Sequence, residues 1–316
     1  DRDNSISADG GDSLDNWHMT QGGFRLDWQE ASSDQITLQG DIYSGKEAGL
    51  YRGGFAVGTT PAPDFEDHTK LAGGNVLGRW SRQLAQNADF KLQTYYDRTK
   101  RKVPGTLDET RNTFDVDFQY HLALNQRHDI LWGVGFRQTR DELDNSPFIA
   151  FIPDHRTDRT YSTFLQDRID VWKRRLFLTF GSKFEHNDYS GFESQPNARL
   201  TWLATNRQTF WAAVSRAARI PSRLDADVSI TAPASTSDAP YPAYVNIVGS
   251  DDFDSEELVA YEAGYRIQAQ QNLSFDISAF YNDYDQLQTV KPQAPVTVVN
   301  FPLTYIVLPN IVDNGM

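Results

Sequence analysis

The chain has 316 residues, of which 13% are aromatic, and its 30 Lys and Arg against 43 Asp and Glu give a formal net charge of −13. A mean hydropathy of −0.57 and the lack of any apolar run of about 18 residues exclude a helical membrane protein. The acidic balance argues against nucleic acid as a partner, because nucleic acid attracts basic stripes that this sequence lacks. Without cysteine, the chain has neither disulfides nor thiolate metal sites.

Segments in which apolar and polar side chains alternate organise the sequence. Residues 1–21 show no such period and are interpreted as a loop. From Gly22 onward the alternation recurs in segments that we expect to be β-strands, since a strand points successive side chains to opposite faces. In chain order they are 24–28, 36–42, 76–80, 90–96, 114–120, 130–136, 161–171, 176–185, 198–202, 208–216, 259–265 and 273–281. The pattern predicts an all-β, antiparallel fold of about twelve strands of roughly 9 to 12 residues, long enough to cross a bilayer at a tilt.

The connections between these segments alternate in length. Short turns of about three to seven residues are typical of one end of a transmembrane β-barrel, and long loops are typical of the other. The expected short turns are 30–34, 82–88, 125–129, 205–207 and a turn near 270. The expected long loops are 44–70, 99–112, 141–157 and 222–255, with 187–195 as an exception to the alternation. This asymmetry favours a membrane barrel over a soluble β-sandwich, in which alternation alone would look the same.

Two stretches are harder to assign. Between residues 161 and 171, Phe164 and Leu165 compete for the apolar face, so the facing of this strand stays open. Residues 298–312 are the most apolar stretch of the chain and are expected to form a loop, because polar residues and prolines interrupt them. The interrupting residues are Asn300, Pro302, Pro309 and Asn310.

Tryptophan and tyrosine are distributed toward opposite ends of the expected strands. The tryptophans near short turns are Trp28, Trp80, Trp132, Trp172, Trp202 and Trp211. The tyrosines toward the long loops are Tyr43, Tyr96, Tyr189, Tyr281 and Tyr284. Amphipathic rings prefer the two headgroup levels of a bilayer, which predicts two aromatic girdles. The alternative is that the tryptophans form the core of a soluble sheet.

Three segments also carry a family resemblance. Residues 215–221, 257–266 and 273–284 resemble the barrel of TonB-dependent outer-membrane receptors. The resemblance is specific over 181–284 and fainter over 22–80. It implies a barrel of about 22 strands with a plug, located in the outer membrane of a Gram-negative bacterium. We expect residues 1–316 to be a partial barrel domain, with the plug, the TonB box, the closing strands and any export signal outside this chain.

The resemblance further implies partners and an activity. Receptors of this family take up siderophores, cobalamin or sugars with energy coupled from the inner membrane. The expected partners are therefore the TonB complex, through the N-terminal region outside this chain, small-molecule cargo such as an iron-siderophore, and outer-membrane lipid and lipopolysaccharide.

Catalytic and cofactor motifs are missing from the sequence. The six histidines lack zinc-ligand spacing, and neither a nucleophile turn nor a phosphate-binding glycine motif occurs. The acidic residues between 251 and 257 lack the ordered spacing of a calcium loop and are interpreted as a solvated loop. We therefore expect no enzyme activity, no cofactor and no metal site.

A basic group follows the strand 208–216. Arg216, Arg219 and Arg223 lie toward the long-loop end, where a bound anion would arrive, and arginine pairs bidentately with carboxylate. We expect these arginines, with Tyr241 and Tyr244 from the next loop, to bind ligand. The alternatives are that the arginines pair with neighbouring carboxylates or lipopolysaccharide and that the tyrosines pack the loop.

The sequence thus supports two functions. The first is a receptor and transporter of scarce cargo in the outer membrane. The second is a soluble or secreted β-rich binding module, for example for carbohydrate, with the aromatic residues in its core.

Overall fold

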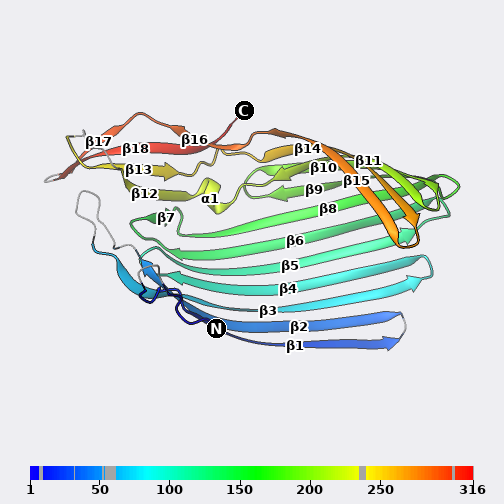
Figure 1. The fold of residues 1–316 in the computed structure, drawn as a ribbon, viewed down its shortest axis with the longest axis horizontal. Coiled ribbons are helices and arrows are strands. Elements are labelled where there is room, and N and C mark those ends of the chain that lie inside the picture. Colours follow the sequence, from blue (N-terminus) through cyan, green and yellow to red (C-terminus); the bar gives the residue numbers. More distant parts are fainter. Residues whose placement is uncertain are drawn as a thin grey trace.

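Most of the described chain forms one antiparallel sheet. The computed structural model describes residues 1–6, 10–31, 33–51, 53, 62–234, 240–300 and 303–315. Within these residues, twelve strands pair in the order β1-β2-β3-β4-β5-β6-β8-β9-β10-β11-β14-β15. Figure 1 shows β1 to β6 and β8 side by side in sequence order, with β15 at a steep angle to β1, as a curved and twisted sheet requires. The all-β antiparallel prediction and the number of strands are confirmed.

The strands of this sheet are β1 (Trp17–Ala31), β2 (Asp34–Tyr51), β3 (Phe65–Ala85), β4 (Ala88–Val103), β5 (Leu107–Ala123), β6 (His128–Asp144), β8 (His155–Trp172), β9 (Leu176–Asn187), β10 (Gly191–Thr205), β11 (Gln208–Arg219), β14 (Glu256–Gln270) and β15 (Leu273–Asp285). One end of the strands carries short turns, and we call it the short-turn end. The turns there are 86–87, 124–127, 173–175, 206–207 and 271–272. The opposite end of the strands, which we call the loop end, carries the connections 145–154 and 220–255.

The strands are longer than the sequence predicted. They extend to 21 residues in β3, and much of the expected loops 44–70, 99–112 and 141–157 is strand. Within 44–70, residues 52 and 54–61 lie outside the described part. The prediction was wrong because alternation fades where both faces of a strand are polar, whereas backbone hydrogen bonds continue regardless of side-chain hydropathy. β4 and β5, for example, pair as far as Val103 and Leu107.

A second sheet lies at the loop end. It is made of β7 (Ile149–Phe151), β12 (Val228–Ala234), β13 (Ala243–Val248), β16 (Gln288–Pro292) and β18 (Leu303–Asn314), with β17 (Val296–Asn300) paired to β18. Figure 1 shows these strands gathered beside the C-terminus. The expected loops 222–255 and 298–312 were therefore wrong in part. Pairing of β18 with β13, β16 and β17 supplies partners that its interrupted local pattern does not reveal.

Helical structure is minimal in the described residues. The helix α1 spans Arg223–Ala226 and begins with a capping box between Ser222 and Asp225. No helix in the described ranges is long and apolar enough to cross a membrane.

The two faces of the large sheet differ in exposure. On β4, Thr94, Tyr96 and Arg98 are exposed, whereas the alternating Tyr95 and Asp97 are half-buried. Curvature crowds side chains on the concave face, so we assign the exposed set to the convex face. The convex face is largely apolar, for example in the register row of Leu176, Trp202, Phe210, Tyr265 and Ile277 near the short turns.

The facing left open by the sequence is resolved on β8. Leu165 pairs with Trp132 on the convex face and is 56% exposed. Phe164 pairs with Gly133 on the concave face. A Cβ atom on Gly133 would lie 2.5 Å from Cε1 of Phe164, so glycine makes room for this ring.

The predicted aromatic girdles are only partly correct. Near the short turns, Trp80 packs edge-on against Phe90 at 4.8 Å between ring centroids, and Trp202 stacks on Phe210 at 5.4 Å. Trp211 instead points to the concave face, over Gly264 and beside the Arg199 guanidinium at 4.4 Å. Among the tyrosines, Tyr43 also lies on the concave face, by its register with Gly73 and Gln21. The sequence pattern near the turns could not distinguish adjacent residues that face opposite ways.

The apolar core is small and sits where the two sheets meet. Leu143, Phe151 and Val228 are buried together, and partly buried apolar side chains pack around them. The neighbouring buried residues are mostly polar or charged, and they form the candidate site.

Candidate functional site

Arg216 joins three strands at the loop end. It lies on β11 just beyond Ser215, the last residue that pairs with β10. Its Nε donates to Oε2 of Glu257 at 3.0 Å, its other nitrogens contact Oε1 of Glu257 and the Ser194 carbonyl, and Oε2 of Glu193 lies 3.9 Å from Nη2. The side chain is 25% exposed. Arg216 therefore fills the notch where β10 separates from β11.

Arg219 points to the opposite face from Arg216. It pairs in register with Glu256 on β14 and forms an ion pair with that residue. Its Nη1 lies 3.2 Å from Oδ2 of Asp225 in α1, and its Nη2 donates to Oε1 of Gln288 at 3.5 Å. The bond from Arg219 lowers the pKa of Glu256 below its ordinary value of 4.5. With 45% of its side chain exposed, Arg219 is the most accessible of the three expected arginines.

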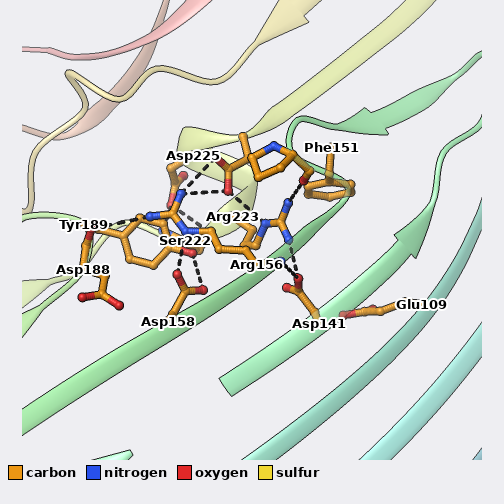
Figure 2. Close-up of polar contacts among 12 residues, drawn as sticks. Glu109, Asp141, Phe151, Arg156, Asp158, Asp188, Tyr189, Ser222, Arg223 and Asp225 are labelled. Atoms are coloured by element: carbon orange, nitrogen blue, oxygen red, sulfur yellow. Dashed lines mark hydrogen bonds and ion pairs between the residues drawn. The ribbon is translucent and has the colours of Figure 1, made fainter. Parts of the chain in front are cut away.

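Arg223 is buried at the start of α1. Figure 2 shows it reaching from the helix to Asp141 on β6. It also donates to the Pro153 carbonyl, and its Nε lies 2.9 Å from Oδ2 of Asp227. Only 7% of the side chain is exposed. A buried charge requires such partners, so Arg223 holds α1 against the barrel wall.

Arg156 joins the buried cluster of Arg223, Asp141 and Asp227, and the sequence analysis missed it. Arg156 on β8 donates to Oδ1 of Asp158 at 2.6 Å and to both carboxylate oxygens of Asp227 at 3.0 Å. Its guanidinium also lies 4.2 Å from the ring centroid of Tyr189. Arg156 and Asp227 are 71 residues apart in sequence, so no local pattern could have found the pair.

Tyr189 closes the cluster from the turn between β9 and β10. Its hydroxyl donates to Oδ2 of Asp158 at 2.7 Å, and Figure 2 shows its ring beside Arg156. Burial, with the adjacent Asp158, raises the pKa of Tyr189 well above its ordinary value of 10.0. The hydroxyl therefore remains a donor at any physiological pH. The sequence analysis had placed Tyr189 in an aromatic girdle, which is wrong because its ring points into this polar cluster.

The expected tyrosines lie in different surroundings. Tyr244 on β13 is 4% exposed and packs edge-on against Tyr305 with ring centroids 5.9 Å apart. Tyr241 precedes β13 and is exposed. The structure thus places Tyr241 at the surface and Tyr244 within the loop-end sheet.

Carboxylates dominate the site. The acidic members around the arginines are Asp141, Asp158, Glu193, Asp225, Asp227, Glu256 and Glu257. They outnumber the four arginines that they contact. No group of three or more His, Asp or Glu side chains in the described residues is arranged to hold a metal ion. Glu256 and Glu257 illustrate why, since adjacent residues of β14 face opposite sides.

A strongly curved antiparallel sheet with an apolar convex face and a charged, loop-covered end defines the wall of a membrane β-barrel. The chain belongs to the TonB-dependent receptor family: the family model described as "TonB dependent receptor-like, beta-barrel" matches residues 1–311. This is a family of receptors and transporters, and membership places the chain in the outer membrane of a Gram-negative bacterium.

Solved structures support the same fold. The siderophore receptor PirA from Acinetobacter baumannii superposes with a TM-score of 0.72 at 16% identity, covering 95% of this chain and 49% of that chain. A mutant of the ferric enterobactin receptor PfeA from Pseudomonas aeruginosa gives 0.58 at 16% identity, covering 94% and 55%. The copper transporter OprC gives 0.67 at 11% identity, covering 99% and 50%. The chain therefore spans about half the length of these structures, and no curated protein sequence matches it.

Proposed function

We propose that the chain is part of an outer-membrane receptor that takes up a scarce small molecule, such as a ferric siderophore, with energy supplied through the TonB complex. The observation that carries this proposal is the family match over residues 1–311. Likeness to two siderophore receptors supports an iron complex as cargo, and likeness to a copper transporter keeps copper as a second candidate. Cobalamin and sugars are the other cargo classes that the family resemblance suggests.

The edges of the large sheet support a longer protein. Among the described residues, β1 and β15 each pair with one strand only, and apart from a single bridge between Arg2 and Trp17 the outer edge of β1 is unpaired. Unpaired strand edges are not tolerated in lipid, because no water is present to satisfy their backbone groups. We propose that further strands outside this sequence pair with β1 and β15, and that a plug and a TonB box belong to the same protein.

The exposure of the five expected ligand-binding side chains indicates which of them could contact cargo. Arg219 and Tyr241 are the exposed members of the expected set, which favours them as cargo contacts at the loop end. Arg216, Arg223 and Tyr244 have their surfaces covered by other parts of the chain, which favours a role in holding the loop-end sheet in place.

The experiment is uptake by the full-length receptor in a bacterial strain that lacks its own ferric-siderophore receptors. We expect uptake of radioactive iron from at least one ferric siderophore, and loss of uptake when a protonophore collapses the energy supply. Labelled copper, cobalamin and sugars in parallel assays distinguish the other cargo classes. A receptor that is assembled in the outer membrane yet takes up none of these cargoes would contradict the proposal.

A further inference from the structure

A basic group on the convex face of β4, β5 and β6 lies apart from the candidate site. Arg98, Asn112 and Arg140 occupy successive register positions across these three strands, and they therefore point to the same side. Lys100 follows Arg98 on that face at the next alternating position of β4. Neighbouring strands lie about 4.8 Å apart, so the backbones of Arg98 and Arg140 are roughly 10 Å apart with Asn112 between them. Two arginine side chains at this spacing can converge on one anion above Asn112.

Arg98, Asn112 and Arg140 border a groove, and Lys100 lies on the same face of β4. The groove has a volume of about 320 Å³, and its walls include Tyr96, Arg98, Asn112, Gln138, Arg140 and Glu142. Within the described ranges, none of the Arg98, Lys100 and Arg140 side chains forms an ion pair or a hydrogen bond. The arginines of the candidate site differ in this respect, because each of them forms an ion pair with a carboxylate. They are Arg156, Arg216, Arg219 and Arg223.

Asn112 presents donors to the same groove. The Tyr96 hydroxyl donates to Oδ1 of Asn112 at 2.8 Å, which leaves the Nδ2 hydrogens of Asn112 for another acceptor. Two carboxylates line the groove as well. Asp141 is already neutralised by Arg223, and Glu142 lies in the next register row, with Thr110 and Lys100. The net charge of the side chains around the groove therefore favours an anion, although the chain as a whole is acidic.

The position of the groove along the strands, relative to the apolar band of the convex face, identifies the source of the anion. Tyr96 and Phe114 form the register row just below Arg98 and Asn112, toward the short-turn end, and each is 43% exposed on the convex face. Below them the convex face is apolar, with Val116, Phe136 and Tyr161 in one row. Exposed rings at the boundary between an apolar band and polar residues mark a headgroup level, here on the loop side of the barrel.

We propose that this groove binds the phosphate headgroup of a lipid in the outer leaflet, with the acyl chains of that lipid lying on the apolar surface below. Guanidinium groups match phosphate oxygens in a bidentate geometry, and Asn112 adds a neutral donor between them. A lipid is the occupant because the convex face of an outer-membrane barrel meets the bilayer. The proposal needs only the outer-membrane location of the family and is independent of the cargo.

Native mass spectrometry of the full-length receptor in detergent tests this site, with bisphosphorylated lipid A, its dephosphorylated form and inorganic phosphate as probes. We expect the wild type to bind bisphosphorylated lipid A, and Arg98→Gln/Arg140→Gln to bind it roughly tenfold or more weakly. The matched control is Lys91→Gln/Arg101→Gln, which removes the same charge from the concave face of β4 and should bind like the wild type.

A second variant covers the case in which the double substitution fails to assemble. Asn112→Asp places a carboxylate between the two arginines, which stabilises them locally and repels phosphate, so it should assemble and lose lipid A. Equal weakening in the control, equal binding of dephosphorylated lipid A, or retention of lipid A by Asn112→Asp would overturn the proposal. Binding of inorganic phosphate without lipid A would reduce the groove to an adventitious anion site.

Discussion

Arg216 and Arg219 lie three residues apart on β11 and bind the adjacent glutamates Glu257 and Glu256 on opposite faces of the sheet. A separation of three along a strand reverses the direction of a side chain, because side chains alternate with a period of two. The two arginines therefore cannot act as one clamp on an anion. Each of them contacts the start of β14, one from each side of the sheet.

Replacement of Arg223 tests the buried cluster. Arg223→Ala leaves Asp141 and Asp227 without a partner that they share, and breaking a buried ion pair costs about 3 to 5 kcal/mol. We expect hydrogen exchange of α1 and β12 in the full-length receptor to accelerate accordingly, while the short-turn end is unchanged. Arg207→Ala, at an exposed short turn, is the control and should change nothing. Unaltered protection of α1 in Arg223→Ala would show that the cluster does not hold this helix.

Removal of one hydroxyl tests the link to the β9–β10 turn. Tyr189→Phe deletes the hydrogen bond to Asp158, and a bond to a charged acceptor contributes about 1.5 to 3 kcal/mol. We expect faster exchange in residues 187–191, where the turn is held. Tyr161→Phe is the matched control, because its ring is exposed on the convex face of β8. The prediction fails if both variants exchange alike.

The two faces of β9 should tolerate charge differently. Leu178 pairs with Ile169 and Leu200 on the convex face, so Leu178→Arg should lower barrel stability by about 2 to 4 kcal/mol. Thr179 pairs with Arg168 and Arg199 on the concave face, which makes glutamate the favourable charge there. Thr179→Glu should therefore assemble like the wild type, as measured by the folded fraction in outer-membrane extracts.

Chemical labelling separates a lipid-facing position from a buried one. In the full-length receptor, Leu178→Cys should react with a lipid-soluble maleimide and resist a charged, membrane-impermeant one. Protection of this thiol from both reagents in the folded receptor would favour the soluble sandwich, in which Leu178 would be part of a core.

Acid should loosen the contact between β14 and β16. The pKa of Glu256 is lowered in the folded protein from an ordinary value of 4.5, chiefly by Arg219, and its carboxylate also accepts the Gln288 amide hydrogen at 2.5 Å. A group with a lowered pKa stabilises the fold above its ordinary pKa, and that contribution is lost as the pH falls through the lowered value.

Hydrogen exchange at Gln288, corrected for the intrinsic effect of pH, measures this contribution. Protection in the wild type should fall below a pH of about 4.5, the ordinary pKa of Glu256. In Glu256→Gln, protection should already be lower at neutral pH and should show little acid dependence. Identical pH profiles for the two proteins would assign the acid response to another group.

A glycine on β14 should be intolerant of any side chain. A Cβ atom at Gly264 would lie 2.3 Å from Nε1 of Trp211, so Gly264→Ala should displace this ring from Arg199 and cost about 1 to 3 kcal/mol. A Cβ atom at Gly22 would have no neighbouring atom within 4 Å, and Gly22→Ala should therefore be neutral. Denaturant midpoints of the two variants in the full-length receptor give the comparison, and similar midpoints would contradict the prediction.

The sequence predicted the strands better than it predicted their ends. Alternation identified all twelve strands of the large sheet because one face of each meets an apolar environment over its middle. It could not follow β4 to Val103 or β5 from Leu107, since both faces are polar there. Trp211 shows a related limit, because position near a turn does not specify which face a side chain takes.

The candidate site was less accessible to sequence reasoning. Arg216, Arg219 and Arg223 were found because they are close together in the chain, but their partners are not. Asp141 is 82 residues from Arg223, and Glu257 is 41 residues from Arg216. Such pairs depend on the register of several strands at once, and a single sequence carries no local signal for them.

The parallel pairing of β13 with β18 has a consequence for the order in which the chain is expected to fold. β14 and β15 intervene between these two partners in the chain, so β13 and β18 can pair only after a complete hairpin of the barrel has followed. Closing such a long connection is entropically slow compared with forming the neighbouring hairpins. We therefore expect the large sheet to form before the loop-end sheet, which would become ordered last.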